Sequence, residues 1–190
     1  MKKPYKLKPH VCRFCTLYPL GDKKIPPELM SYKNEVPDLE GFPYPLPSKK
    51  SEYSCCEKTG DIEWFGASKG LTRYDKNAER EEDIIMYFSA PRDLYDNNVK
   101  AIMPDGENVW VLTETGAVYI EMKMISAEEK ALLLLAETQK YVDRRGMISQ
   151  KYLSEPRNLE SILPYGHSDN DGSFTSGFAI GEIFRYATYK

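Results

Sequence analysis

An internal repeat is the feature of this sequence that most restricts its fold. The segment SEYSCCEKTGDIEWFGASKGLTRYD aligns with NVKAIMPDGENVWVLTETGAVYIE further along the chain. The matched pairs are Trp64 with Trp110, Gly60 with Gly106, and Gly70 with Gly116, and all share one offset of 46 (110 − 64, 106 − 60, 116 − 70). Tyr74 and Tyr119 are 45 apart, one residue out of register. A shared offset of aromatic residues and glycines predicts two copies of one structural unit.

Each copy of the repeat predicts short strands joined by tight turns. Alternating and aromatic residues favour strands, and the glycines favour the turns between them. We expect Gly70 and Gly116 to adopt positive φ in the second turn of each copy. The predicted strands span residues 53–57, 62–66, 71–74, 84–88, 99–103, 109–113 and 117–121. Four short antiparallel strands repeated at about 40 to 50 residues are typical of propeller blades.

These segments resemble the repeats of two-component-regulator propellers. The stretches IEWFGASKGLTRYD, DLYDNNVKAI and NVWVLTETGAVYI are similar to a strand with Trp, then G-T-x-x-G-L-x-R-Y-D, then L-x-x-N-x-V. The similarity covers about residues 53–121 and departs at Leu112, where that pattern usually has Gly, and at Ala117, where it usually has Leu. The resemblance implies a sensor-type propeller that binds ligands or partners and is not itself catalytic.

About two blades are visible, whereas closed propellers have typically four to eight. Open sheets expose faces and edges that can pair with other chains. The chain therefore covers its sheets with its own arm and helices, pairs with another chain, or is a piece of a larger protein. Residues 1–50 are rich in Pro and Lys and carry no lasting helical or strand period. They predict an extended arm that wraps over another element, or a loosely ordered tail.

Helical periodicity follows the repeats. Ser126 and Glu129 form a capping box at the start of a helix. Arg144 and Arg145 suit the negative end of that helix, and Gly146 is a natural stop. The run at residues 132–135 is apolar on all sides, so we expect it to be buried or docked against a partner.

The end of the chain predicts a second helix. Residues 147–166 are expected to be extended, and the helix to run from about Ser173 to the last residue. Gly177 and Gly181 are four apart and permit close approach of a neighbouring backbone. Each costs roughly 1 kcal/mol relative to Ala in a solvated helix, which only tight packing would compensate.

A polar cluster precedes this last helix, and three interpretations compete for it. In the first, Asp171 or Ser173 caps the helix by accepting hydrogen bonds from its first N–H groups. In the second the cluster is a calcium loop, but with Gly172 in the sixth position His167 and Phe178 occupy positions that need oxygen ligands. In the third the cluster is catalytic or contacts a substrate, because carboxylates at a helix start can act as acid, base or sugar-binding groups. The candidate catalytic residues are Asp169, Asp171 and His167, with Asn170 as a ligand-binding candidate.

The segment SDNDGSFTSGFAIGEIFRYA also resembles the D-N-D-G-x-x-T opening of a helix in α/α-toroid domains. The matching residues are Asp169, Asn170, Asp171, Gly172 and Thr175. The resemblance covers about 20 residues, extended to 126–190 with the preceding helix, and implies the start of a carbohydrate-active domain. Such a toroid needs about a dozen helices, and two are predicted here. Any active site would therefore be incomplete within this chain.

Aromatic residues and cysteines supply the remaining candidates. Trp64 and Trp110 could be sugar-stacking platforms, although equivalent aromatics in a β repeat more often pack structurally. Cys12 and Cys15 have the spacing of half a zinc site, with His10 as a third ligand, but no second pair completes it. Cys55 and Cys56 are adjacent, which is poor geometry for one metal, so reduced thiols without a special role are the simpler interpretation.

Charge and hydropathy limit the partners. A net charge of −3 gives no global field that would attract nucleic acid or anionic lipid. No stretch approaches the roughly 20 apolar residues of a membrane span. The basic start lacks the apolar core of a signal peptide, which taken literally indicates an intracellular protein. No cofactor is predicted.

Together these observations predict an α+β chain: an extended arm at residues 1–50, two propeller-type repeats at 51–122, and a helical segment at 123–190 that is part of an α/α domain. The favoured function is a non-enzymatic binding or assembly module whose core is completed by a protein partner or larger complex. The alternative is a fragment of a carbohydrate-active, glycoside hydrolase or lyase-like protein with a propeller sensor domain. A third possibility is a sensor that binds a glycan on the propeller face.

Overall fold

The computed structural model of the chain describes residues 11–16, 24–155, 158–163 and 168–189. Its contacts divide the chain into two compact units. The sheet unit comprises residues 15–123, and the helical unit comprises residues 124–190 together with residues 1–14. The repeat therefore lies within the sheet unit, and the polar cluster lies within the helical unit.

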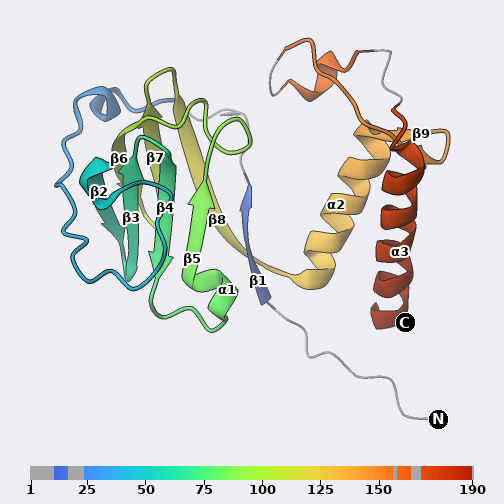
Figure 1. Cartoon of the computed structure of the whole chain (residues 1–190), viewed down its shortest axis with the longest axis horizontal. Coiled ribbons are helices and arrows are strands. Elements are labelled where there is room, and N and C mark those ends of the chain that lie inside the picture. The colour runs from blue at the N-terminus through green and yellow to red at the C-terminus, as the bar shows by residue number, and fades with distance from the viewer. Residues whose placement is uncertain (1–10, 17–23, 156–157, 164–167, 190) are drawn as a thin grey trace. The chain divides into compact units, whose positions relative to one another are not determined.

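The structure contains two four-stranded sheets, and residues 15–123 of the sheet unit supply most of their strands (Figure 1). The strand orders are β2-β3-β4-β5 and β1-β8-β7-β6, and the pairs from β2 to β5 and from β6 to β8 are antiparallel. The strands are β1 Val11–Thr16, β2 Tyr53–Thr59, β3 Ile62–Ala67, β4 Gly70–Asp75, β5 Ile85–Phe88, β6 Val99–Asp105, β7 Asn108–Thr113 and β8 Ala117–Ser126. The chain is therefore α+β with antiparallel sheets, as the sequence predicts. Each predicted strand is present to within a few residues, and a short helix, α1 Glu81–Ile84, precedes β5.

Residues that are 46 positions apart in the sequence also occupy equivalent positions in the strand pairing of the two sheets. Trp64 of β3 lies opposite Arg73 of β4, and Trp110 of β7 lies opposite Tyr119 of β8. Arg73 and Tyr119 are therefore equivalent (119 − 73 = 46), whereas the alignment of Tyr74 with Tyr119 is wrong. A register shift follows the first residue of β2 and of β6 alike, between positions 53 and 55 and between positions 99 and 101. The two hairpins thus share one pairing register, including its irregularity.

The main core lies between the two sheets, which pack through β2, β3 and β6. Its buried residues are Cys55, Trp64, Leu71, Phe88, Leu94, Val99, Ile102, Val109, Val111, Val118 and Ile120. Gly66 of β3 permits this approach, because an added Cβ would lie 2.5 Å from Cys55 Sγ and 2.6 Å from Val99 Cγ1. One face of each sheet is therefore buried against the other sheet.

The turn glycines behave differently in the two copies. Gly60 and Gly106 have φ of 62° and 65°, and Gly70 has φ of 113°, so the first turn is equivalent in both copies. The prediction of positive φ at Gly116 is wrong. Glycine is needed there for space, because an added Cβ would lie 2.7 Å from Cδ2 of Tyr95.

Residues 1–50 are not without regular structure. They contain β1 and a 3-10 helix, η1 Pro27–Ser31, and a second 3-10 helix, η2 Lys50–Glu52, follows. Leu29 of η1 and Leu39 are fully or almost fully buried. The absence of a lasting period in the sequence does not exclude these short elements, because β1 pairs with β8 and η1 packs against β6 and β7.

In the helical unit, α2 Ala127–Tyr141 begins with the predicted capping box. Ser126 Oγ accepts a hydrogen bond from Glu129 N (3.1 Å), and Ser126 N donates to Glu129 Oε2 (2.7 Å). The predicted stop at Gly146 is wrong. The helix ends at Tyr141, and a hairpin of β9 Asp143–Arg144 and β10 Met147–Ile148 follows.

The hairpin explains the early end of α2. Its two turn residues, Arg145 and Gly146, have φ of 55° and 85°. Positive φ at both positions is the conformation of a tight two-residue β-turn. Gly146 therefore closes a hairpin instead of ending a helix, and Arg144 lies in a strand.

The last helix is α3 Asp171–Tyr189, which begins two residues before the predicted start. Between the hairpin and α3 lie a 3-10 helix, η3 Leu159–Ser161, and a bridge from Leu153 to Ile162. No helix in the described part of the chain is long and apolar enough to cross a membrane.

Candidate functional site

The polar cluster at the start of α3 is a structural joint. Asp171 is 5% exposed, and its Oδ1 accepts hydrogen bonds from Ser168 N (3.2 Å) and Ser168 Oγ (3.3 Å). Ser168 Oγ in turn accepts from Asn170 N (3.2 Å). The capping hydroxyl is therefore that of Ser168, upstream of the predicted Asp171 or Ser173, and the Asp171 carboxylate points back toward it.

The same cluster fastens α3 to the hairpin. Arg144 Nη2 lies 3.8 Å from Asp171 Oδ2, and Thr175 Oγ1 accepts a hydrogen bond from Ile148 N (3.0 Å) while donating to Asp171 O (2.7 Å). These contacts assign Asp171 and Thr175 of the D-N-D-G-x-x-T segment to packing. Asp169 and Asn170 are exposed. His167 lies outside the described residues, so its position relative to the carboxylates is open.

No metal cage accompanies these residues. Among the residues that the structure describes, no group of three or more His, Cys, Asp or Glu side chains is placed to hold a metal ion. His10 and the side chains of Cys12 and Cys15 lie outside the described part. Cys55 and Cys56 have free thiols. Burial raises the pKa of the Cys55 thiol to about 11, and burial together with the nearby carboxylates of Glu35 and Glu57 raises the pKa of Cys56, so neither is a poised nucleophile.

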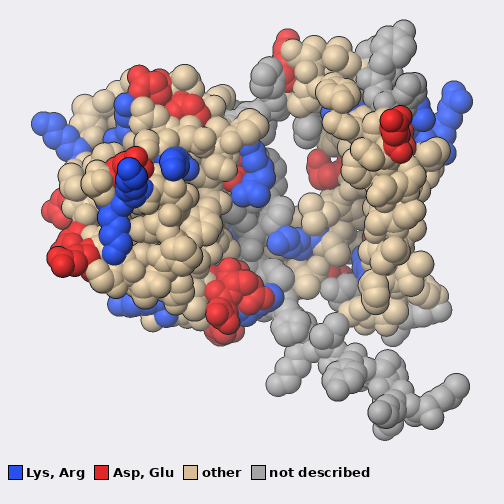
Figure 2. Space-filling model, viewed as in Figure 1, with Lys and Arg blue, Asp and Glu red and all other residues tan. Residues whose placement is uncertain are grey.

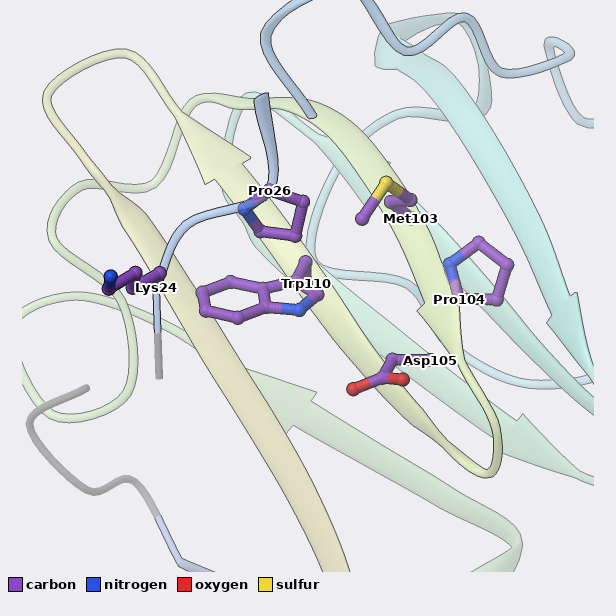
Figure 3. A pocket seen from close by; sticks show the side chains of 6 residues that line it. All are labelled: Lys24, Pro26, Met103, Pro104, Asp105 and Trp110. Carbon is purple, nitrogen blue, oxygen red and sulfur yellow. The ribbon is translucent and has the colours of Figure 1, made fainter. Parts of the chain in front are cut away.

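The two tryptophans of the repeat have different surroundings. Trp64 is fully buried between the sheets, and its Nε1–H donates to Thr59 Oγ1 (2.9 Å), so no ring face is free to stack on a sugar. Trp110 lies on the opposite, outer face of its sheet, with its ring centroid 4.9 Å from that of Tyr119. It lines a pocket of about 300 Å³ (Figure 3). The lining residues are Lys24, Pro26, Met103, Pro104, Asp105 and Trp110.

This pocket offers limited chemistry. Trp110 is only 4% exposed, so its ring forms the floor rather than an open platform. Asp105 Oδ2 accepts a hydrogen bond from Tyr119 OH (2.9 Å), which engages part of the one carboxylate in the lining. Of the two sugar-platform candidates, the geometry retains Trp110 and assigns Trp64 to the core.

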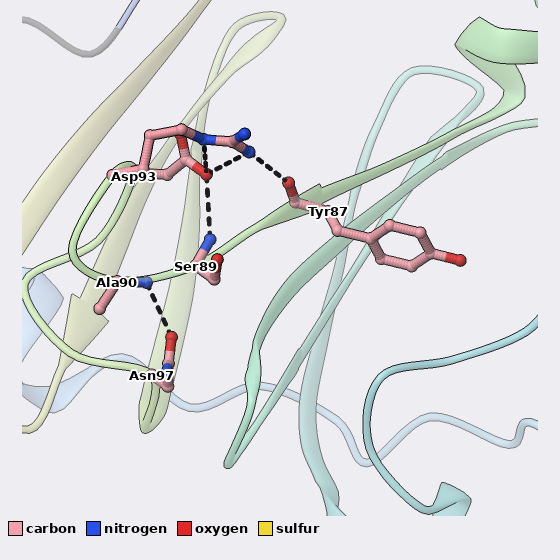
Figure 4. A network of polar contacts seen from close by, with 6 residues as sticks. Tyr87, Ser89, Ala90, Asp93 and Asn97 are labelled. Atoms are coloured by element: carbon pink, nitrogen blue, oxygen red, sulfur yellow. Dashed lines mark hydrogen bonds and ion pairs between the residues drawn. The ribbon is translucent and has the colours of Figure 1, made fainter. Parts of the chain in front are cut away.

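The loop that joins the sheets accounts for the L-x-x-N-x-V part of the repeat (Figure 4). Leu94 and Val99 are buried in the core. Asn97 Oδ1 accepts a hydrogen bond from Ala90 N (2.8 Å), and Asn97 O accepts from Gly70 N (2.8 Å). Beside it, Asp93 Oδ2 accepts from Ser89 N (3.1 Å). These hydrogen bonds fix the path of the chain between the two sheets.

The two helices of the helical unit expose large apolar side chains. No residue of α2 is buried, and in α3 the described residues bury only Asp171. Eight large apolar side chains on these helices are 42–69% exposed: Leu132, Leu133, Leu134, Phe174, Ile180, Ile183, Phe184 and Tyr186. Figure 2 shows few charged side chains on the visible face of α3. We name these eight residues the apolar helix surface.

A groove adjoins this surface. It has a volume of about 460 Å³ and is lined by Val142, Ile148, Ser149, Gln150, Ser173, Phe174, Gly177 and Phe178. An added Cβ at Gly177 or Gly181 would meet nothing within 4 Å. Close approach at these glycines therefore does not occur within the described residues. Leu132, Leu133 and Leu134 are 47–50% exposed, so the expectation that the run at residues 132–135 is buried is wrong for these three.

Searches against protein-family models, curated proteins and solved structures find no match for this chain. The resemblances to propeller repeats and to an α/α toroid therefore stay predictions from the sequence.

Proposed function

We propose that this protein is a non-enzymatic binding or assembly module that docks a protein partner on the apolar helix surface. The observation that carries the proposal is the exposure of these eight side chains on α2 and α3, in which Asp171 is the one buried residue among those that the structure describes. Ile180, Ile183 and Phe184 are spaced i, i+3 and i+4 along α3 and so share one face of that helix, and contiguous exposed apolar patches typically mark interaction sites. The charged side chains among these residues on α3, Glu182 and Arg185, pair with each other (2.6 Å).

In this proposal the sheet unit is the scaffold, built from two propeller-type blades. The shared pairing register of the two hairpins supports the blade interpretation, because repeated blades have equivalent strands. A non-enzymatic role is supported by Asp171, whose carboxylate is buried and bonded to Ser168 and close to Arg144. A carboxylate in this position orders the chain and is not presented to a substrate.

The alternative is a glycan-binding or carbohydrate-active fragment that uses Asp169 and Asn170. Their exposure at the start of α3 is the observation in its favour. It predicts turnover of acidic oligosaccharides that is lost in Asp169→Asn, or saturable glycan binding that is lost in Trp110→Ala. The alternative would be refuted if Asp169→Asn left oligosaccharide turnover unchanged and Trp110→Ala left glycan binding unchanged.

Binding by purified chains tests the main proposal. Phe184 is 69% exposed, so Phe184→Glu leaves the fold intact while placing a charge in the apolar helix surface. Ser176→Glu, at an exposed polar position of the same helix, is the matched control. We expect Phe184→Glu to weaken partner binding, or self-association measured by light scattering, by about tenfold or more, and Ser176→Glu to leave it unchanged. A compact wild-type monomer at micromolar concentration that captures no protein in a Phe184-dependent manner would refute the proposal.

A further inference from the structure

The groove between the β9–β10 hairpin and α3, which we name the hairpin groove, has walls that are fastened to each other. The hairpin lies against the first turns of α3 (Figure 1), and Ile148 N donates to Thr175 Oγ1 (3.0 Å) across this junction. Arg144 Nη2 and Asp171 Oδ2, which are 3.8 Å apart, connect the same two elements. Because these contacts are made within the chain, the groove is formed before any ligand binds.

Ser149, one of the residues that line the hairpin groove, has a buried hydroxyl without a partner. The residue is 2% exposed, and its backbone N donates to Val142 O (3.0 Å). In the part of the helical unit that the structure describes, Ser149 Oγ is the one buried side-chain nitrogen or oxygen without a hydrogen-bond partner. A buried polar atom in this state is costly and indicates that a bound molecule completes it. The hydroxyl can donate or accept, because its hydrogen is free to turn.

The rest of the lining is uncharged and mainly apolar. Phe174 and Phe178 are four residues apart on α3, so they share one face of that helix. The other lining residues are Val142, Ile148, Gly177, Gln150 and Ser173. An ion in this groove would lose hydration without gaining a counter-charge from the lining, whereas an aromatic ring would meet two aromatic side chains. The lining therefore favours an uncharged aromatic ligand.

The volume of the hairpin groove limits the size of the ligand. It is about 460 Å³, within the range of small-molecule pockets. At roughly 30 Å³ for each non-hydrogen atom in a liquid, this is room for about 15 such atoms. Gly177 contributes to this space, because an added Cβ there would meet nothing within 4 Å. A molecule with one or two rings therefore fits.

We infer that the hairpin groove binds a small uncharged aromatic molecule with one hydroxyl group, in the manner of a phenol. The ring packs against Phe174 and Phe178 and removes their apolar surface from water. The hydroxyl of the ligand forms the hydrogen bond that Ser149 Oγ lacks. This site goes beyond the docking of a protein on the apolar helix surface, and it is tested on the purified chain alone.

Proton–nitrogen NMR of the isotope-labelled full chain measures binding, with para-cresol as the probe. We expect saturable shifts at the amides of Ser149 and Gly177, with a Kd of about 1 mM or tighter for a probe of this size. Para-xylene, which lacks the hydroxyl, should bind about tenfold more weakly. The para-toluate anion should shift neither amide. Absence of saturable para-cresol binding would overturn the inference, and so would equal binding of para-cresol and para-xylene, since water alone would then satisfy the Ser149 hydroxyl.

Two glycine variants establish where the probe binds. Gly177→Leu should weaken para-cresol binding by about tenfold or more, because the added side chain fills the groove, and leucine favours the helix more than glycine does. Gly172→Leu is the matched control, because Gly172 also lies on α3 with nothing within 4 Å of an added Cβ, but it does not line the groove. We expect the control to bind as wild type does. Wild-type affinity in Gly177→Leu would overturn the inference.

Ser149→Ala separates the hydrogen bond from the apolar contacts. We expect para-cresol binding to weaken about tenfold and para-xylene binding to stay unchanged. The urea midpoint of the unliganded chain, followed by the circular dichroism of its helices, should not fall, because no hydrogen bond within the chain is lost. A variant in which both affinities fall together, or in which the midpoint falls, would contradict the role of Ser149. None of these results depends on a protein partner, so they are independent of the outcome for Phe184→Glu.

Discussion

Removing Arg73 should destabilise the sheet unit more than removing the cation of an exposed ion pair. Arg73 Nη2 lies 2.9 Å from Asp75 Oδ2, and the two side chains are 0% and 3% exposed. At an effective dielectric constant of about 20, their attraction is about 6 kcal/mol, which desolvation of both charges offsets in the intact pair. Arg73→Met keeps the volume but leaves the Asp75 carboxylate buried without its cation. We expect a loss of about 3–5 kcal/mol in the free energy of unfolding.

Urea unfolding followed by tryptophan fluorescence measures this loss. The only two tryptophans of the chain, Trp64 and Trp110, lie in β3 and β7, so the signal reports on the sheets. Arg92→Met is the matched control. Arg92 also pairs with an aspartate, Asp93 (2.8 Å), but its side chain is 77% exposed, so we expect a loss below about 1 kcal/mol.

A double variant separates the missing cation from the missing packing. With Arg73→Met and Asp75→Leu together no charge stays buried, and we expect most of the lost stability to return. The remaining deficit is about 1–2 kcal/mol, because Asp75 Oδ1 also accepts a hydrogen bond from Asn77 N (3.1 Å) and Arg73 Nη1 also donates to Asp83 O (3.3 Å). If Arg73→Met costs no more than Arg92→Met, or if the double variant is as unstable as the single one, the reasoning from a buried ion pair is wrong.

Two further predictions concern the sheet unit. Partial burial raises the pKa of Asp96, but hydrogen bonds from Thr115, Asn98 and Thr113 outweigh it and hold the pKa at about 2, below the ordinary 3.8. The ionised Asp96 therefore stabilises the fold above pH 4 and stops doing so as the pH falls toward 2. The urea midpoints of wild type and Asp96→Asn should consequently differ at pH 7 and converge near pH 2. A difference between the two midpoints that does not vary with pH would contradict this prediction. Gly66→Ala should lower the free energy of unfolding by about 1–3 kcal/mol, because the added methyl group meets side chains of both sheets. Gly116→Ala should lower it less, because the Tyr95 ring that the methyl group meets is half exposed and can turn away. Equal losses for the two variants in urea unfolding would refute this distinction.

Local signals in the sequence predicted the elements well. The strands follow from alternation and from glycine turns, and the start of α2 follows from Ser126 and Glu129, because each depends on residues close in the chain. The end of α2 was predicted wrongly because a glycine after a helical run favours a helix stop. Only the pairing of β9 with β10 shows that Gly146 closes a hairpin instead. Contacts outside the helical run decided that case.

The candidate site was harder to predict, because burial is a tertiary property. The carboxylates before α3 have the composition of an acid–base pair, but Asp171 is buried against Ser168 and Arg144. The two tryptophans occupy equivalent positions of the repeat, yet Trp64 lies between the sheets and Trp110 packs against Leu29 on the outer face of its sheet. Residues 132–135 are apolar all round, which indicates contact with another surface but does not say which one.

The departures from the repeat pattern held information that the matches did not. Leu112 and Ala117 replace Gly and Leu of the pattern, and they face each other across β7 and β8. Their equivalents, Gly66 and Leu71, lie against the second sheet, where the missing side chain of Gly66 leaves room for the Val99 side chain of that sheet. A face that receives a sheet needs that glycine, and a face that receives an extended segment does not. Loss of the glycine in the second copy alone therefore marks the face at which the stack of sheets ends, because a third sheet could not approach the second one past the Leu112 side chain.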